Sequence, residues 1–348
     1  MHILVTGGCG FIGSHFIRYS LNKYPEAKII NVDSMTYAAH PDTAKYLEGL
    51  SPSRYQLIQE DITSPKVADL IRSAALDAVI NFAAETHVDR SILEPSIFVM
   101  TNIKGVENLL NAARKKGGVR FLQVSTDEVY GSLAPVDPKS VEASPLSPNS
   151  PYAASKAAAD LLVLANNKTY AQDVVVTRCT NNFGPYQFPE KFVPLMIANA
   201  IEGLPIPVYG DGQQVRDWIY VDDHCTGIDA CLRKGVSGEV YNISSNNEQK
   251  NLDVAKGLLK TLGKPESLLK FVGDRPGHDR RYGLDASKIR NELGWKPEFS
   301  FEAGMEKTIA WYKANEAWWR KLRGKAFYDY YAANYDVKFK NATAGGNQ

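Results

Sequence analysis

The chain opens with a short apolar run that leads into three spaced glycines, Met1-His2-Ile3-Leu4-Val5-Thr6-Gly7-Gly8-Cys9-Gly10-Phe11-Ile12-Gly13. Gly7, Gly10 and Gly13 fit the spacing G-x-x-G-x-x-G, a variant of the dinucleotide-binding fingerprint. Glycines at these positions allow a tight turn and let a pyrophosphate approach backbone N–H groups at the start of a helix. The stretch predicts a strand, a turn and a helix that opens with Phe11 and Ile12, together holding a dinucleotide.

An aspartate ends the second predicted strand. Asp33 follows Gly13 by twenty residues. A carboxylate at this place accepts hydrogen bonds from the ribose hydroxyls of adenosine and repels a 2′-phosphate, which favours NAD over NADP. We therefore predict NAD as the cofactor, and we include the next residues, Ser34, Met35 and Thr36, among its contacts.

Further cofactor contacts are expected after the third and fourth predicted strands. Asp61 and Ile62 can border the adenine, although Asp61 can equally cap the helix that follows it. The small residues of the next stretch would let a cofactor lie over the backbone, as expected for Phe82-Ala83-Ala84-Glu85.

Short apolar runs alternate with longer helix-patterned segments through the first half of the chain. The expected strands are His2–Thr6, Lys28–Val32, Arg54–Gln59, Ala78–Phe82, Phe121–Ser125 and Val174–Arg178. The expected helices lie near Phe11–Asn22, Pro65–Ala74, Ile103–Lys115 and Tyr152–Tyr170. This alternation predicts βαβ units and an α/β fold, a doubly wound parallel Rossmann sheet with helices on both faces.

The pattern changes after residue 180, where five prolines between Pro185 and Pro207 favour loops and short elements. Val221–Leu232 and Glu239–Ile243 are expected to return to the sheet. Later helices are expected at Leu252–Leu262, Ala286–Leu293 and Phe301–Trp319. We predict an NAD-binding domain from 1–180 with 221–250, a smaller α/β substrate-binding lobe from 181–220 and 251–330, and a tail at 331–348.

Composition narrows the classes of partner. Forty Lys and Arg against 39 Asp and Glu leave a formal net charge of +1, so no overall charge favours nucleic acid or an anionic membrane. No apolar run reaches the roughly 18 residues that span a bilayer, and the N-terminus does not have the pattern of a signal peptide. The four cysteines form no C-x-x-C pair, and the histidines are scattered. We expect a cytoplasmic protein with reduced thiols and no metal site.

A second motif carries chemistry at the point where the apolar run Phe121–Val124 ends, Ser125-Thr126-Asp127-Glu128-Val129-Tyr130-Gly131. Tyr152 and Lys156 follow it, one helical turn apart on the same face. An ammonium beside a phenol stabilises phenolate and lowers a tyrosine pKa from about 10. Tyr152 could then take a hydroxyl proton while hydride passes to NAD. Close like charges push the pKa values of two acids apart, so Asp127 and Glu128 can serve as one acid and one base.

With these motifs the chain resembles the extended short-chain dehydrogenase/reductase family, and within it the nucleotide-sugar 4,6-dehydratases. The resemblance spans residues 1 to about 330. It includes the glycine loop and the segments Ala84–Ser91, Ser125–Gly131, Tyr152–Lys156, Asn181–Pro185, Arg216–Trp218 and Asp274–His278.

The resemblance implies a lyase that acts on a nucleotide sugar, with dTDP-glucose as the first choice, and that uses tightly bound NAD. In such enzymes the sugar is oxidised at carbon 4, loses water across carbons 5 and 6, and is reduced again at carbon 6. By resemblance Tyr152 is the base at the 4-hydroxyl and Lys156 tunes it. Thr126 binds the 4-oxygen, Glu128 removes the proton on carbon 5, and Asp127 protonates the departing 6-hydroxyl.

The resemblance also assigns binding residues. Thr101 and Asn182 match cofactor contacts. The substrate contacts that it implies are Thr86, Thr126, Asn181, Lys191, Phe192, Pro207, Val208, Tyr209, Arg216, Asn251, Asp274, Arg275 and His278. Guanidinium groups suit a diphosphate because they can bind it through two hydrogen bonds. The resemblance further implies a homodimer.

Three other interpretations stay open. The substrate can be a UDP-, CDP- or GDP-linked sugar. The enzyme can be a 4-epimerase or a decarboxylase on the same scaffold, although these usually lack an acid where Asp127 stands. A non-catalytic NAD-binding regulator is the third alternative, and the presence of both Tyr152 and Lys156 speaks against it.

Overall fold

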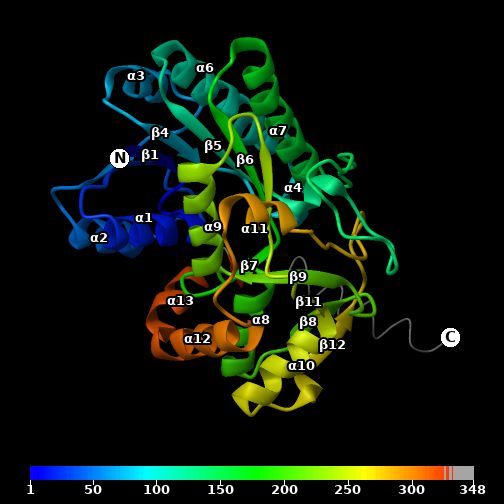
Figure 1. Cartoon of the computed structure of the whole chain (residues 1–348). Coiled ribbons are helices and arrows are strands. Elements are labelled where there is room, and N and C mark those ends of the chain that lie inside the picture. The colour runs from blue at the N-terminus through cyan, green and yellow to red at the C-terminus, as the bar shows by residue number, and fades with distance from the viewer. Residues whose placement is uncertain (325–326, 329–330, 332–348) are drawn as a thin grey trace.

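A seven-stranded parallel sheet forms the centre of the computed structural model, which describes residues 1–324, 327–328 and 331 (Figure 1). The strand order is β10-β6-β5-β4-β1-β2-β3, and every neighbouring pair is parallel. The strands are β1 His2–Thr6, β2 Lys28–Asp33, β3 Tyr55–Gln59, β4 Ala78–Asn81, β5 Arg120–Thr126, β6 Val174–Cys179 and β10 Val240–Ile243. The predicted Rossmann-type sheet is confirmed.

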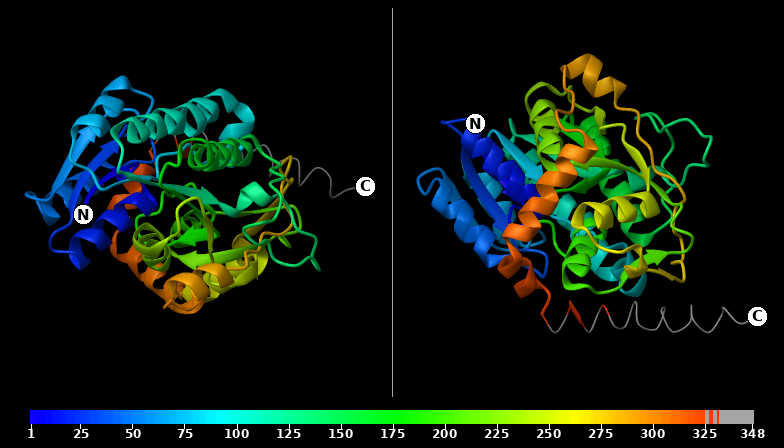
Figure 2. Two further views of the ribbon diagram at one scale, coloured as in Figure 1. Left: turned by 45° about the horizontal axis from the view of Figure 1, so that its top comes forward. Right: turned by 90° about the horizontal axis from the view of Figure 1, so that it is seen from below.

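Helices cover both faces of this sheet (Figure 2). On one face lie α3 Pro65–Ser73, α6 Val106–Lys116 and α7 Pro151–Tyr170. On the other face lie α1 Phe11–Lys23, α2 Pro41–Leu50, α9 Val221–Lys234 and α11 Ser287–Leu293. The two layers explain why the strands are continuous apolar runs, because both of their faces are buried.

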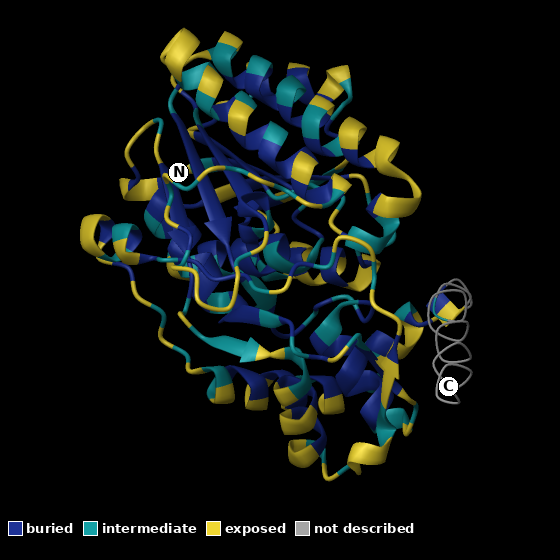
Figure 3. Ribbon diagram, turned by 90° about the vertical axis from the view of Figure 1, so that its right-hand side faces the viewer, coloured by how far each residue is buried: buried dark blue, intermediate teal, exposed yellow. Residues whose placement is uncertain are grey.

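The alternation of side chains along a strand builds two separate cores. Ile3 and Val5 of β1 point to the cluster under α1 and α9, whereas Leu4 points to the cluster under α3 and α6. All three side chains are at most 1% exposed. Figure 3 shows the same arrangement over the whole sheet, with buried strands inside helices whose outer sides are exposed.

A smaller lobe lies below the carboxyl edge of the sheet in Figure 1. It contains a three-stranded sheet, a two-stranded sheet and a helical layer with its own apolar cluster. Its strands are β7 Asn181–Phe183, β8 Ile206–Tyr209, β9 Val215–Tyr220, β11 Glu248–Lys250 and β12 Leu269–Val272. Its helices are α8 Phe192–Glu202, α10 Asn251–Leu262, α12 Phe301–Ala314 and α13 Glu316–Leu322, with the 3-10 turn η3 Glu266–Leu268.

The structure departs from the sequence prediction between Pro185 and Pro207, where the prolines favoured loops and short elements but helix α8 forms. Helix α8 contains Pro194 within its first turn, where a missing backbone N–H costs no intrahelical hydrogen bond. The helix predicted at Phe301–Trp319 is two helices, which meet at Asn315.

The helix expected at Ile103–Lys115 also differs in its start. It is preceded by α4 Val88–Leu93, α5 Pro95–Phe98 and the π-helical segment η1 Val99–Gly105, which runs directly into α6. Single π-turns occur often at functional sites, and this one carries Thr101 to the cofactor side of the sheet.

The predicted division into an NAD-binding domain and a substrate-binding lobe stays a prediction, with one departure. Helix α11 was assigned to the lobe within 251–330, but it packs against α9 and β10 at the sheet. Ile289 and Leu293 join the sheet's apolar cluster, which explains its position. The predicted tail lies outside the described residues apart from residue 331. Among the described helices, none has the combination of length and apolar character that crossing a membrane requires.

Candidate active site

Two adjoining cavities, of about 330 and 200 Å³, lie between the carboxyl edge of the sheet and the small lobe. The first follows the glycine loop and the ends of the central strands, and the second extends into the small lobe. Residues from both parts of the chain line both cavities, namely Thr86, Glu128, Asn181, Asn182, Gln187, Glu190 and Lys191. A ligand with two ends could therefore occupy the second cavity and reach the first.

Gly7 and Gly13 of the glycine loop have no room for a side chain. Gly7 adopts a φ of 69°, and a Cβ there would lie 2.7 Å from the backbone nitrogen of Ala83. A Cβ on Gly13 would lie 2.4 Å from the carbonyl oxygen of Gly7. The loop thus forms a closely packed backbone cradle at the start of α1, and such a cradle suits a pyrophosphate.

Asp33 is held at the end of β2 by two backbone hydrogen bonds. Its carboxylate accepts from the N–H of Cys9 at 2.8 Å and from the N–H of Met35 at 2.8 Å. Burial raises the pKa of Asp33, while these two hydrogen bonds oppose that shift. The carboxyl group is thereby fixed beside the glycine loop, where a ribose would lie.

The first cavity contains nearly all of the predicted cofactor residues. It is lined by Gly7, Gly10, Phe11, Ile12, Gly13, Asp33, Ser34, Thr36, Asp61, Ile62, Phe82, Ala83, Ala84, Glu85, Thr101 and Asn182, with Tyr152 and Lys156. Met35 does not line it and serves through its backbone N–H. The carboxylate of Asp61 accepts from the backbone N–H of Thr63 at 2.7 Å, so this residue also stabilises the turn before α3.

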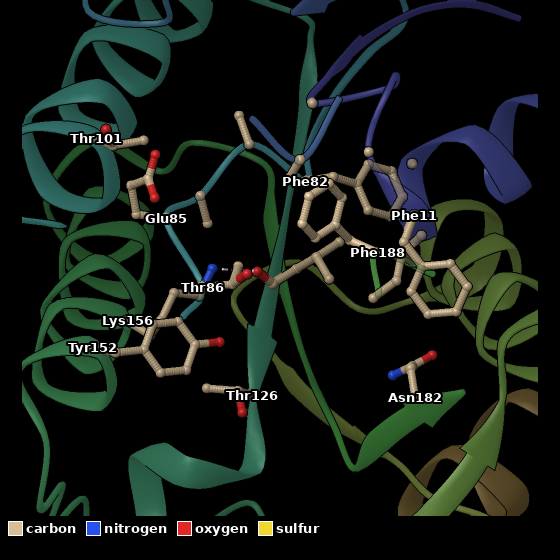
Figure 4. A pocket seen from close by; sticks show the side chains of 18 of the residues that line it. Phe11, Phe82, Glu85, Thr86, Thr101, Thr126, Tyr152, Lys156, Asn182 and Phe188 are labelled. Atoms are coloured by element: carbon tan, nitrogen blue, oxygen red, sulfur yellow. Dashed lines mark hydrogen bonds between the residues drawn. The ribbon is translucent and has the colours of Figure 1, made fainter. Parts of the chain in front are cut away.

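Helix α7 carries Tyr152 and Lys156 into the same cavity. The helix begins after Ser150, whose hydroxyl accepts from the backbone N–H of Ala153 at 3.1 Å. Figure 4 shows both side chains extending from α7 toward β5 and Thr126, while Phe11 and Phe82 lie on the other side of the cavity. Lys156 Nζ donates to the carbonyl oxygen of Val124 at 2.7 Å.

The other surroundings of Tyr152 oppose the lowering of its pKa that is predicted from Lys156, and that effect of Lys156 stays a prediction. Burial raises the pKa of Tyr152 well above its usual value, and Glu128 and Cys179 raise it further. Only the hydrogen bond with Thr126 is among the main influences that lower it. Tyr152 is buried beside Glu128 and Asp127, and both acids disfavour a second negative charge on its phenol.

Asp127 and Glu128 sit in a 3-10 turn, η2 Asp127–Tyr130, that begins as β5 ends. The hydroxyl of Thr126 starts the turn, accepting from the N–H of Glu128 at 3.2 Å and donating to Asp127 Oδ1 at 3.1 Å. Asp127 is 4% exposed, and its Oδ2 has no hydrogen-bond partner among the described residues.

The two acids have different electrostatic surroundings. Burial, and then the neighbouring Glu128, raise the pKa of Asp127 well above its usual value. Burial also raises the pKa of Glu128, but Arg275, Arg216 and Lys191 all act to lower it. The arrangement favours a protonated Asp127 next to a Glu128 that can lose its proton.

The second cavity contains most of the predicted substrate residues. It is lined by Thr86, Asn181, Lys191, Phe192, Pro207, Tyr209, Arg216, Asn251, Arg275 and His278, and Thr126 lines the first cavity. Two predicted contacts do not line either cavity. Val208 is buried in β8 at 1% exposure, and Asp274 accepts from the ring Nδ1 of His278 at 2.5 Å. Asp274 therefore orients His278 instead of facing the cavity.

Three cations approach the cavities from different elements. Arg216 Nη2 donates to the carbonyl oxygen of Asp279 at 2.9 Å, and Lys191 Nζ donates to that of Thr86 at 2.9 Å. Arg275 pairs with Asp89 at 3.2 Å. This local positive charge, in a chain whose charges nearly cancel, suits the diphosphate of a nucleotide sugar.

Sequence reasoning missed several lining residues. Gln187 and Glu190 line both cavities and come from the proline-marked segment before α8, and Tyr282 lines the second. Their position depends on the path of a loop, which no local pattern reports. His87 and Asp89 also line the second cavity, and their presence in the motif Ala84–Ser91 was a usable signal. In the part of the chain that the structure describes, no three His, Cys, Asp or Glu side chains are placed to hold a metal ion.

The fold and the two cavities are those of a dinucleotide-binding enzyme. Its cavity contains Tyr152 and Lys156 together with the acids Asp127 and Glu128. The sequence model of the family described as GDP-mannose 4,6 dehydratase matches residues 4–308. The dTDP-glucose 4,6-dehydratase of Xanthomonas campestris pv. campestris (strain B100) is 47% identical over 90% of this chain and 94% of its own. The dTDP-glucose 4,6-dehydratase of Escherichia coli is 46% identical over 92% and 96%.

Solved structures agree with these relatives. The dTDP-glucose 4,6-dehydratase DesIV of Streptomyces venezuelae, solved with NAD and TYD bound, matches with a TM-score of 0.88 and 46% identity, covering 92% of this chain and 100% of that one. The UDP-glucose 4-epimerase of Thermus thermophilus, solved with NAD, has the same fold at a TM-score of 0.82 and 27% identity over 90% of this chain and 100% of that one. The chain belongs to the dTDP-glucose 4,6-dehydratase family.

The glycine loop generates a direct test of cofactor binding. In Gly13→Ala the new methyl group would meet the carbonyl oxygen of Gly7 at 2.4 Å, so the loop must shift. Overpacking of this kind costs about 1–3 kcal/mol, and NAD affinity should fall about tenfold or more. The measurement is the NAD content of the purified protein, together with titration of NAD into stripped protein.

The matched control is Gly49→Ala in α2, where a Cβ has no heavy atom within 4 Å. This variant should keep NAD at the level of the unchanged protein. Equal NAD affinity in the Gly13→Ala variant would contradict the proposed role of the loop.

Proposed function

We propose that this chain converts dTDP-glucose to dTDP-4-keto-6-deoxyglucose. The reaction oxidises carbon 4, eliminates water across carbons 5 and 6, and reduces carbon 6. The residues of the first cavity would hold NAD, which accepts the hydride from carbon 4 and later returns it to carbon 6. NAD is therefore regenerated in each turnover, and the net reaction is the loss of water.

One observation carries this proposal. Two adjacent acids lie beside Tyr152. Burial raises the pKa of both, that of Asp127 to well above its usual value, while three cations oppose the rise at Glu128. Simple oxidation of an alcohol needs a base but no second acid. Elimination of water needs both a base at carbon 5 and an acid at the leaving hydroxyl.

The first stage depends on Tyr152, Lys156 and Thr126. Tyr152 takes the proton of the 4-hydroxyl, and Lys156 holds the nicotinamide ribose and supports the phenolate. Burial raises the pKa of Tyr152, so the phenolate depends on this support from Lys156 and on the hydrogen bond with Thr126. Thr126 donates a hydrogen bond to the 4-oxygen and so stabilises the enolate-like intermediate.

The second stage depends on the acid pair. The 4-keto group makes the proton on carbon 5 acidic, and Glu128 removes it. Asp127 gives its proton to the 6-hydroxyl, which departs as water while the carbon 5–carbon 6 double bond forms. Glu128 then returns a proton to carbon 5 when carbon 6 is reduced.

The nucleotide end of the substrate would lie in the second cavity. Arg216 and Arg275 would bind the diphosphate, with the base between β8 and the start of α8 near Pro207, Tyr209 and Phe192. In this proposal residues 1–180 and 221–250 hold NAD, and residues 181–220 with most of 251–330 hold the nucleotide sugar.

A 4-epimerase is the second candidate, because epimerases with NAD share this fold. A product assay separates the two reactions. Dehydration yields a 4-keto-6-deoxy sugar that absorbs in the near ultraviolet in alkali, whereas an epimer does not. A panel of dTDP-, UDP-, CDP- and GDP-glucose separates the proposed substrate from its relatives.

Glu128→Gln tests the assignment of the base. An amide cannot take the proton from carbon 5, so formation of the 4-keto-6-deoxy product should fall about a hundredfold or more. NAD binding and oxidation at carbon 4 should persist, and bound NADH should accumulate as an absorbance change in a single turnover. Normal product from this variant would remove Glu128 from the mechanism.

The matched control is Glu107→Gln, the same exchange on α6, where Glu107 pairs with Lys104 on an exposed face. It should turn over at the rate of the unchanged protein.

We further propose a homodimer. Large apolar side chains are exposed on α4, α5, η1 and α7, which contact one another along one side of the molecule. They are Ile92, Leu93, Ile97, Val99, Met100 and Leu161, with Leu93 74% exposed. Contiguous apolar surface of this kind supports a contact between copies of the chain.

We also propose a cytoplasmic location, because the reducing conditions of cytoplasm suit the four buried free thiols.

The double variant Leu93→Glu/Leu161→Glu should sediment as a monomer at concentrations where the unchanged protein sediments as a dimer. The new glutamate carboxylates would lose their hydration in the contact without gaining a partner of opposite charge, and this disfavours association. Val136→Glu is the control, because Val136 is 93% exposed on the loop after η2. A monomeric unchanged protein would rule out the dimer.

A further inference from the structure

Helix α7 carries a third titratable residue on the face that bears Tyr152 and Lys156. Asp160 follows Lys156 by four residues, and its side chain is 0% exposed. Residues four apart are neighbours on a helix surface, so the carboxyl group lies one turn behind the lysine, away from the substrate. It lines neither cavity, and the reaction steps above do not use it.

Asp160 forms a buried ion pair with the neighbouring strand. Arg178 of β6 donates from Nε to Asp160 Oδ2 at 2.9 Å, and the two side chains are 3% and 0% exposed. In the sheet Arg178 lies opposite Ser125 of β5, which directly precedes the Thr-Asp-Glu motif. The pair therefore joins α7 to β6, whose neighbour β5 carries the Thr-Asp-Glu motif.

A hydrogen-bonded chain fixes the arginine from its other side. Arg178 Nη1 donates to Tyr130 Oη at 2.9 Å, and Tyr130 donates to Asn242 Oδ1 of β10 at 2.9 Å. Tyr130 belongs to the motif at the end of β5, but it lines neither cavity. Tyr130 therefore links Arg178 to Asn242 by hydrogen bonds.

Lys156 is a buried cation in need of a counter-charge. Burial lowers its pKa, and Asp160, followed by Cys179 of β6, are the neighbours that raise it. In return burial raises the pKa of Asp160, which Arg178, Lys156 and the hydroxyl of Ser125 oppose. In Figure 4 Lys156 also lies beside Tyr152 on α7, and its Nζ donates to the carbonyl oxygen of Val124 on β5. Asp160, one helical turn from Lys156, is therefore the carboxyl group that most opposes the effect of burial on the lysine.

We infer that the Asp160–Arg178 ion pair is a positioning pair for Lys156, which holds the lysine charged and in place beside Tyr152. Arg178 keeps Asp160 ionised, and Asp160 keeps Lys156 protonated. Neither residue touches the substrate or the cofactor. The inference rests on the proposed function, in which Lys156 acts as an ammonium.

Asp160→Asn tests the inference through the pH dependence of kcat. Activity must fall as pH rises through the pKa of Lys156, because the neutral amine cannot support the phenolate. Loss of a neighbouring opposite charge lowers such a pKa by about one to three units. The alkaline limb of the kcat profile should therefore move to lower pH by about one unit or more, while KM for dTDP-glucose changes less than about threefold.

Asp160→Asn leaves Arg178 buried without its partner and could fail to fold. The double variant Asp160→Asn/Arg178→Gln removes both charges together and leaves an amide pair in the same place. It should fold, retain NAD and show an alkaline limb displaced to lower pH, by less than in Asp160→Asn because the positive charge of Arg178 is removed as well. Asp222→Asn is the control for loss of an acid elsewhere, because Asp222 pairs with His15 and Arg18 near the start of α9. It should lower the melting temperature without moving the limb.

The outcomes separate the inference from the proposed function. If the unchanged protein forms no 4-keto-6-deoxy product, the proposed function fails. If it does form that product and the alkaline limb of the double variant overlays that of the unchanged protein, the inference fails. A uniform loss of kcat at every pH would assign the pair to stability alone and would also overturn it.

Discussion

A row of buried hydrogen bonds across the three central strands sets the geometry on which the site depends. Thr6 of β1 donates to Asn81 Oδ1 of β4 at 2.5 Å, and Asn81 Nδ2 donates to Gln123 Oε1 of β5 at 2.9 Å. All three side chains are 0% exposed, so each would be costly to leave without a partner. A slip of one residue would break the row and turn apolar side chains to the wrong face.

That register aligns the ends of the strands. Gly7 follows Thr6, Phe82 follows Asn81, and the Thr-Asp-Glu motif begins three residues after Gln123. Parallel pairing sends all of these residues to one edge, so the pyrophosphate cradle and the acid pair lie in a single cavity. The row of polar side chains therefore fixes the register of the strands. Apolar packing alone would fix it less specifically, because apolar contacts tolerate small shifts.

The residues that line the first cavity could be predicted because they belong to short sequence motifs. Much of the second cavity could not, because its residues are brought there by long-range packing. The glycine loop, Asp33 and Tyr152–Lys156 are short motifs whose spacing within strands and helices determines where they lie. By contrast, Gln187, Glu190 and Tyr282 reach the cavities through loops of the small lobe, and Pro194 concealed a helix. Val208 and Asp274 stand next to cavity residues, but strand pairing and a hydrogen bond to His278 turn them away. The effect of burial on the pKa of Tyr152 was also not visible in the sequence, because spacing does not report burial.

The acid pair shows how a small element of backbone can assign different chemistry to neighbouring residues. A 3-10 turn has about three residues per turn, so successive side chains point roughly 120° apart. In η2 this directs Asp127 back to Thr126 and into a buried space, while Glu128 reaches both cavities and the field of three cations. If the same two acids continued the strand, they would point to opposite faces of the sheet, and one would leave the site. Both acids therefore reach the site only because β5 ends at Thr126. The capping hydroxyl that ends the strand lies beside the phenol of Tyr152, so one side chain links the acid pair to the tyrosine.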